Sequence, residues 1–416
     1  MYIPRKRKFW SVGVAHLTND IFMSAGIVIL TFLSATVLPM SNTQIGFAVS
    51  AKQIAGAITQ PFFGLRADKT GGRAIGAGGL LWVIITFALS VFMAVVTKNY
   101  WAMLIPFILQ GIGSGAVHPV GALHAAETNE ERSATSTAYF FLMGQLGLAL
   151  GPTVVGLLLD RANVGSLIPL GDWLGFPGAG LFNPNFTPVF WLCLVAVPIV
   201  GFVFTGIPKS RERATDTGTS TDEDGKTKNS AFEIVSWTPF FVIGAMVILR
   251  GLAQPGSVNF IPVLFEQKGW SAAEYGAITS SFWIASAISG VVFGNLADKY
   301  DRRYVVMASM VLSAPAFFLL PLLDGAAAFA LAIIAGGLSG GSHSIIVVLA
   351  QELIPDSKGF ASGAILGFIF GTGALGSLAI GIISDSIGLS VTFQFVSIAA
   401  ALAGVLGLFL PKRVAD

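Results

Sequence analysis

Charged residues are scarce in this chain. Lys, Arg, Asp and Glu together make up 11% of its 416 residues, whereas hydrophobic residues make up 54%. Soluble globular domains carry about 25% charged residues. So few charges cannot cover a water-exposed surface, so most of the surface must face lipid. We therefore expect a polytopic membrane protein.

Residues that build enzyme and metal sites are also scarce. There is one cysteine, Cys193, which excludes an intrachain disulfide and a thiolate metal site, and there are four histidines. No nucleophile–base pair, metal-ligand set or phosphate-binding loop is visible in the sequence. We therefore expect no enzymatic activity, no metal and no cofactor. The net charge of +2 gives no reason to expect a nucleic-acid partner.

Long apolar runs predict twelve membrane-spanning helices. A spanning helix needs about 20 mostly apolar residues, and runs of this length recur along the chain between charged or turn residues. The predicted spans are 9–37, 43–66, 73–97, 100–127, 131–161, 187–208, 237–266, 271–296, 303–324, 326–354, 357–385 and 389–411.

The distribution of Lys and Arg predicts the orientation. Twelve spans place both termini on one side, and the loops on that side hold most of the basic residues. The opposite side holds only Lys98, Arg161 and Lys268. Basic loops stay in the cytoplasm, so we expect both termini there. The expected location is the bacterial plasma (inner) membrane, with the lipid bilayer as surroundings and a monomer as the functional unit.

An internal repeat divides the chain. The segment 64–69 recurs at 294–299, an offset of 230 residues, and 114–118 recurs at 339–343, an offset of 225. We predict two six-helix bundles, at 1–208 and 231–416, joined by a flexible polar linker at 209–230. The apolar external stretch 162–187 is either an interfacial loop or a lid over the external mouth.

The repeated loop carries a family resemblance. Its first copy runs from Gly64 to Arg73 and its second from Gly294 to Arg303, and both resemble the loop signature of the major facilitator superfamily. The acids Glu127, next to Arg132, and Glu352, next to Lys358, resemble gate residues that pair with these loops. The gating motif implied by the resemblance comprises Gly64, Asp68, Arg73, Glu127, Arg132, Gly294, Asp298, Arg302 and Glu352.

A more specific resemblance is to the fosmidomycin-resistance efflux proteins, a bacterial drug-export branch. The residues that carry it are 16–20 in the first helix, 111–119 in the fourth and 350–355 with 362–376 near the end. In the fifth helix, Gly147, Gly151 and Pro152 resemble the exporters' bend signature, although ordinary small-residue packing is an alternative. The sequence departs from the exporter pattern at Phe107, where many proton-coupled exporters carry arginine.

The resemblance implies an all-α protein of the major facilitator fold, with twelve helices in two pseudo-symmetric bundles. It also implies alternating access and proton-coupled efflux, as in an antiporter, of small anionic or zwitterionic compounds. Drugs such as fosmidomycin are included, which would confer antibiotic resistance.

Ionisable residues at membrane depth form the candidate site, because charges there are costly and face the bundle interior. Asp20 lies about 16 Å along the first helix at 1.5 Å per residue, near the midplane, and Arg250 occupies the equivalent position of the seventh. We expect the pseudo-two-fold to face Asp20 towards Arg250. The pair is either a latch between the halves or a substrate and coupling site.

Other polar residues extend this site. His16 lies one turn from Asp20, and His118 and His343 are repeat-related; each histidine is either structural or proton-coupling. Metal binding is the less favoured alternative, because no carboxylate or thiol cluster accompanies the histidines. Lys52 either snorkels or pairs with a polar group on the eleventh helix. The residues expected to bind substrate or protons are Asp20, Arg250, His16, Asn19, His118, His343, Lys52 and Gln254.

Two further functions stay open. The cationic groups favour an anionic small-molecule substrate, and protonating Asp20 would free Arg250 to bind it. Proton-coupled import of an organic or phosphorylated anion is therefore an alternative to export. A lipid-handling or sensor protein on the same fold is an alternative of another class. It predicts a lateral opening and no proton dependence.

Overall fold

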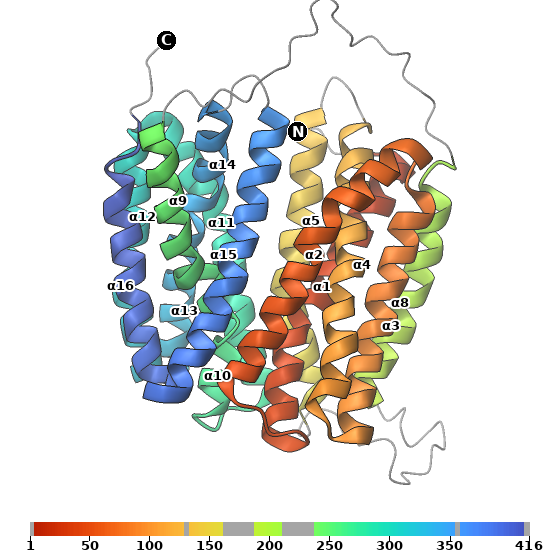
Figure 1. Ribbon diagram of the computed structural model, residues 1–416, viewed down its shortest axis with the longest axis horizontal. Helices are drawn as coiled ribbons and strands as arrows, with labels where there is room; N and C mark the ends of the chain where they lie inside the picture. Colours follow the sequence, from red (N-terminus) through yellow and green to blue (C-terminus); the bar gives the residue numbers. More distant parts are fainter. Residues whose placement is uncertain (1–3, 129–132, 161–186, 210–236, 354–357, 412–416) are drawn as a thin grey trace, which may run out of the picture.

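The computed structural model describes residues 4–128, 133–160, 187–209, 237–353 and 358–411, and the regular secondary structure in these ranges is helical (Figure 1). The first half of the chain forms α1 (Arg7–Thr36), α2 (Asn42–Thr70), α3 (Arg73–Thr97), α4 (Tyr100–Ala126), α5 (Ser133–Leu159) and α8 (Thr187–Gly206). The predicted linker beyond residue 209 and the external stretch 162–186 lie outside the described residues.

The second half forms α9 (Trp237–Gly251), η2 (Leu252–Gly256), α10 (Ile261–Glu266), α11 (Ala272–Lys299), α12 (Arg302–Leu319), η3 (Leu320–Leu322), α13 (Gly325–Gly340), α14 (Ser342–Leu353), α15 (Lys358–Ile387) and α16 (Leu389–Gly407). The two halves stand side by side, and the marked chain ends lie at the same end of the molecule (Figure 1). We call this end the terminal side and the opposite end the distal side.

Eleven helices of the described part are long and apolar enough to cross a membrane. Each of the twelve predicted spans coincides with a helix or a broken helix. The seventh span is not one continuous α-helix, because it passes through the π-turn of η2, which contains Pro255, before α10. The tenth is interrupted at Gly341, between α13 and α14. Proline removes a helical hydrogen bond, which accounts for the break at η2. At Gly341 the backbone stays in the right-handed helical region, and the interruption is a single turn residue.

The first seam between the halves joins α2 to α15. A side chain at Gly46 would lie 2.6 Å from the Ser377 carbonyl oxygen, and one at Gly381 would overlap the Asn42 carbonyl. The amide of Asn42 also donates to the Asp385 carboxylate at 2.9 Å. The absence of side chains at these glycines lets the two backbones touch.

The second seam joins α5 to α11. A side chain at Gly276 would overlap the Pro152 carbonyl, and one at Gly156 would overlap the Ala272 carbonyl. The two seams are copies of each other: Gly276 follows Gly46 by 230 residues, and Gly381 follows Gly156 by 225. These are the offsets of the sequence repeat.

Both seams lie on the distal side. They involve the first third of α2 and α11 and the last third of α5 and α15. Four hydrogen bonds that cross between the halves lie there too. The two bundles are therefore fastened together at the end opposite the termini, where α2 and α15 approach each other in Figure 1.

Candidate functional site

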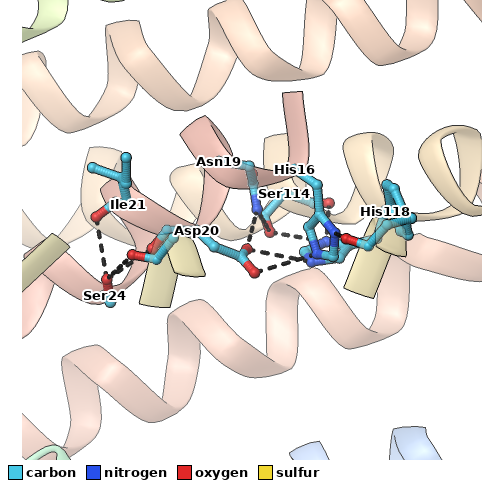
Figure 2. A network of polar contacts seen from close by, with 9 residues as sticks. His16, Asn19, Asp20, Ile21, Ser24, Ser114 and His118 are labelled. Atoms are coloured by element: carbon cyan, nitrogen blue, oxygen red, sulfur yellow. Dashed lines mark hydrogen bonds and ion pairs between the residues drawn. The ribbon is translucent and has the colours of Figure 1, made fainter. Parts of the chain in front are cut away.

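A carboxylate faces two neighbouring imidazole rings in the first bundle (Figure 2). Asp20 Oδ2 is 3.3 Å from His16 Nε2, and Asp20 Oδ1 is 3.5 Å from His118 Nε2. The two rings meet edge to face with centroids 4.9 Å apart. We call His16, Asp20 and His118 the His–Asp–His cluster.

The cluster is assembled by three helices. His16 and Asp20 lie one turn apart on α1, and His118 lies on α4. From α5, Gly144 faces the cluster so closely that a Cβ there would lie 2.8 Å from Asp20 Oδ2, and one at Gly147 would lie 2.8 Å from Asp20 Cβ. Helix α5 can pass this close only because both positions lack a side chain.

Backbone carbonyls orient both rings. His16 Nδ1 lies 2.9 Å from the Phe140 carbonyl oxygen, and His118 Nδ1 lies 2.8 Å from that of Ser114. A carbonyl oxygen only accepts hydrogen bonds, so each Nδ1 must carry the proton. In a neutral ring, each Nε2 then presents a lone pair to the carboxylate. His16 is further fixed by stacking on the Phe140 ring, with centroids 4.1 Å apart.

Asn19 supplies the cluster's hydrogen-bond donor. Its Nδ2 donates to Asp20 Oδ1 at 2.8 Å and to Ser114 Oγ at 3.1 Å, as the dashed lines in Figure 2 show. Its Oδ1 is buried and has no hydrogen-bond partner among the described residues. The sequence indicated Asn19, Asp20 and both histidines, but gave no sign of Ser114, Gly144 or the Phe140 carbonyl as their neighbours.

Arg250 forms a separate polar centre in the second bundle. Its Nε donates to Ser342 Oγ at 2.9 Å and its Nη2 to Gln254 Oε1 at 2.6 Å. Gln254 in turn donates to Ser286 Oγ at 3.2 Å. The guanidinium is 1% exposed, and within the described part of the chain it has no ion pair with a carboxylate.

The expected pairing of Asp20 with Arg250 is therefore absent from this conformation. Asp20 turns towards α4 and α5 of its own bundle, and Arg250 turns towards α14 and its own helix. Each charged group has polar partners within its own half. Its burial is therefore compensated without a contact from the other bundle. The position of each residue along its helix was predictable from the sequence, but the direction of its side chain was not.

Lys52 also departs from expectation. Its Nζ donates to the Met23 carbonyl at 3.0 Å and lies 4.4 Å above the centre of the Phe107 ring. It is 3% exposed, so it does not snorkel, and its hydrogen bond goes to α1 and not to a polar group on α15. The ammonium thus lies over the aromatic residue that stands where many exporters carry arginine, and it is stabilised by a cation–π contact.

The repeat-related histidines lie in different surroundings. Among the described residues, His118 contacts His16 and Asp20, not His343. His343 is half-buried on α14 in the bundle of Arg250. The expectation that no carboxylate accompanies the histidines is wrong for His16 and His118, because the Asp20 carboxylate lies beside both rings.

The gating residues gather at the terminal ends of the helices. Arg302 donates two hydrogen bonds to Glu352, at 2.6 and 2.7 Å, which ties the second loop to α14. Glu127 forms an ion pair with Lys8 at 2.8 Å, a contact that the sequence did not reveal. Arg73 donates to the Ile207 carbonyl at 2.6 Å. Arg132 lies outside the described residues.

The remaining positions of the gating motif form two matched sets. Gly64 and Gly294 are half-buried, and Asp68 and Asp298 are exposed at the ends of α2 and α11. In α5, Gly151 packs against the Ile21 carbonyl of α1. Pro152 lies in the second seam, so it faces the other bundle, whereas Gly147 faces Asp20 of the cluster.

Comparison with known proteins agrees with this architecture. The family model of the Major Facilitator Superfamily matches residues 12–268 and 243–416. The chain belongs to the Major Facilitator Superfamily. It is therefore a multi-pass membrane transporter of small molecules and not an enzyme.

Two bacterial relatives match this superfamily member over almost their whole lengths. The fosmidomycin resistance protein of Escherichia coli (strain K12) is 24% identical over 409 residues, covering 97% of this chain and 92% of the relative. The uncharacterized MFS-type transporter YfnC of Bacillus subtilis (strain 168) is 24% identical over 411 residues, covering 96% and 92%.

Solved structures share the fold at lower identity. A bacterial homologue of the human lysosomal transporter Spinster superposes with a TM-score of 0.77 at 14% identity, covering 96% of this chain and 95% of that one. The D-xylose–proton symporter superposes with a TM-score of 0.73 at 16% identity, covering 97% and 98%. At these identities the likeness shows the fold alone.

Proposed function

We propose that this chain is a proton-coupled exporter of small anionic or zwitterionic compounds, including phosphonate drugs such as fosmidomycin. The observation that carries the proposal is that the candidate proton-binding group and the candidate anion-binding group lie in different bundles. The first holds the His–Asp–His cluster, which can bind protons. The second holds Arg250, a buried guanidinium whose contacts in the described part of the chain are all neutral.

Alternating access supplies the transport cycle. The seams fasten the distal ends of the bundles, whereas His118, in the terminal half of α4, keeps a side chain that is 27% exposed. With the termini in the cytoplasm, as the basic loops favour, this conformation is closed to the outside and admits substrate from the cytoplasm. Rocking one bundle against the other would then expose the site externally.

The cluster is suited to carry the coupling proton. Because both Nδ1 protons are donated to carbonyls, the lone pairs of the two Nε2 atoms face the two carboxylate oxygens. A proton on either Nε2 would turn one of these contacts between acceptors into a hydrogen bond with the carboxylate and would thus be stabilised. The titratable groups that meet there are His16, Asp20 and His118, from α1 and α4. Helix α5 contributes glycines and the Phe140 carbonyl.

Proton-coupled import remains the second candidate. It was favoured by the idea that protonating Asp20 releases Arg250 for an anion, and the separation of these two groups weakens that argument. Export is supported by the relative from Escherichia coli, whose name describes fosmidomycin resistance. The two functions differ in the sign of coupling, so one measurement separates them.

The test uses purified full-length protein in liposomes, with labelled fosmidomycin and a panel of organic anions at equal concentration on both sides. An acidic exterior should drive substrate out of the vesicles by exchange for protons. The sign of this flux does not depend on how the protein is inserted. Accumulation inside would indicate import, and flux that ignores the gradient would refute proton coupling.

A matched pair of variants locates the coupling site. Asp20→Asn should abolish the gradient-driven flux and keep exchange of substrate for substrate, which moves no net proton. Asp324→Asn makes the same chemical change at a surface carboxylate that pairs with Lys268, and it should behave as the wild type. Gradient-driven flux that survives in Asp20→Asn would remove the cluster from the proposal.

A further inference from the structure

The His–Asp–His cluster has the composition of a metal site as well as of a proton site. His16 Nε2, His118 Nε2 and a carboxylate oxygen of Asp20 lie within 4.8 Å of one another. None of the three atoms bears a proton when the rings are neutral and the Nδ1 protons are donated to carbonyls. Three lone pairs therefore converge on one small volume.

We propose that this cluster binds a divalent transition-metal cation, with Zn²⁺ or Co²⁺ as the class it fits. Two imidazoles and one carboxylate form a common three-ligand set for such ions. Ca²⁺ and Mg²⁺ prefer sites built entirely from oxygen, so the two imidazoles select against them. The negative charge of the Asp20 carboxylate also offsets one of the two positive charges of the metal ion.

The distances fit a tetrahedral ion. Bonds of about 2.0–2.1 Å place neighbouring ligand atoms about 3.3 Å apart in a tetrahedron. The two observed nitrogen–oxygen separations are 3.3 and 3.5 Å. These separations involve the two different oxygens of the Asp20 carboxylate. For one ion to reach all three ligands, one of these oxygens must move towards the second ring and the two rings must approach each other.

The surroundings of the ligands support the same assignment. Metal-binding imidazoles usually donate their second N–H to a carbonyl or carboxylate, which fixes the ring. Both rings do so here, through the carbonyls of Phe140 and Ser114. His118 is 27% exposed, which leaves an open side through which an ion can enter and a water can complete the shell.

Cobalt provides a direct test on the protein alone. Tag-free, purified full-length chain is titrated with Co²⁺ at one fixed pH, and the visible absorption of tetrahedral cobalt is recorded. The wild type should bind one equivalent, which Zn²⁺ should displace. His118→Gln and Asp20→Asn should each weaken binding by at least about a hundredfold, since each loses a ligand and second-shell losses alone reach 10–100-fold.

His343→Gln is the matched control, because this histidine is the repeat counterpart of His118 and should leave the cobalt spectrum unchanged. If a ligand variant fails to fold, X-ray absorption of the zinc-loaded wild type still counts the ligands and should find two imidazoles. Absence of a tetrahedral spectrum in the wild type, full binding in His118→Gln, or fewer than two imidazoles around zinc would each overturn the proposal. Cobalt binding is measured without any transport assay, so failure of the metal proposal can be distinguished from failure of the export proposal.

Discussion

The glycines of the distal seams should set the balance between the two conformations of the transporter. Replacing Gly46 with alanine adds a methyl group 2.6 Å from the Ser377 carbonyl oxygen, whereas ordinary contacts begin at about 3.4 Å. The closed seam must open by roughly 0.8 Å to accept it. A conformation in which the bundles separate on the distal side has no such conflict.

The size of the effect follows from the cost of overpacking. Forcing a methyl group into a close-packed contact costs about 1–3 kcal/mol. Because only the closed-seam state bears this cost, the equilibrium should move towards the distal-open state by about 5- to 150-fold. The gain in helix propensity from alanine acts on both states and cancels.

Distances between spin labels measure this shift. Labels at Lys98 and Gln267, two exposed distal positions in different halves, would be introduced after replacing the buried Cys193. The Gly46→Ala protein should show a longer distance than the parent. Gly276→Ala, its repeat counterpart in the second seam, should do the same.

Gly78→Ala controls for the substitution itself, because a side chain there would meet nothing within 4 Å. It should leave the distance distribution unchanged. If Gly46→Ala and Gly276→Ala match the Gly78→Ala control, the seams do not determine which side is closed, and the assignment of this structure to one stage of a rocking cycle is wrong.

Three further predictions concern charged groups inside the bundles. Asp20→Asn and Arg250→Gln should alter thermal stability additively, within about 0.5 kcal/mol, because the groups do not touch; a larger coupling in the double variant would show that they interact in solution. Lys52→Met should unfold no earlier than the wild type, because exchanging a buried charge for an apolar side chain is often neutral or stabilising; a marked loss would reveal an acidic partner. Arg302→Gln should lower the free energy of unfolding, measured by chemical denaturation, by about 1–2 kcal/mol, a value kept small because Glu352 is half-exposed. An unchanged denaturation midpoint would mean that this gate contact adds no stability.

Much of the fold was predictable from the sequence, because a bilayer requires long apolar helices. Apolar length predicted the helices to within a few residues, and the starts of α3 and α4 were predicted at Arg73 and Tyr100, where the structure has them. The breaks in the seventh and tenth spans were missed, since a hydropathy pattern does not show where the hydrogen bonds of a helix are interrupted.

The candidate site was predicted less well. Depth along a helix follows from counting residues, so Asp20, His16 and Arg250 were indicated correctly as membrane-buried groups. The direction of a side chain depends on its neighbours across the packing interface, which counting does not give. Asp20 was expected to face the other bundle, and it instead faces α4 because Gly144 and Gly147 allow α5 to close behind it.

The seams also bear on how such a protein can change its cargo over evolutionary time. Their tightest contacts run from a glycine to a backbone carbonyl, so they do not depend on the identity of side chains in the middle of the membrane. Substitutions around Asp20 or Arg250 can therefore accumulate while the two bundles keep the same fit, which under the function proposed above would change the cargo. Because the two seams are related by the internal repeat, the same arrangement of small residues fastens the bundles twice, independently of the polar groups that each half holds.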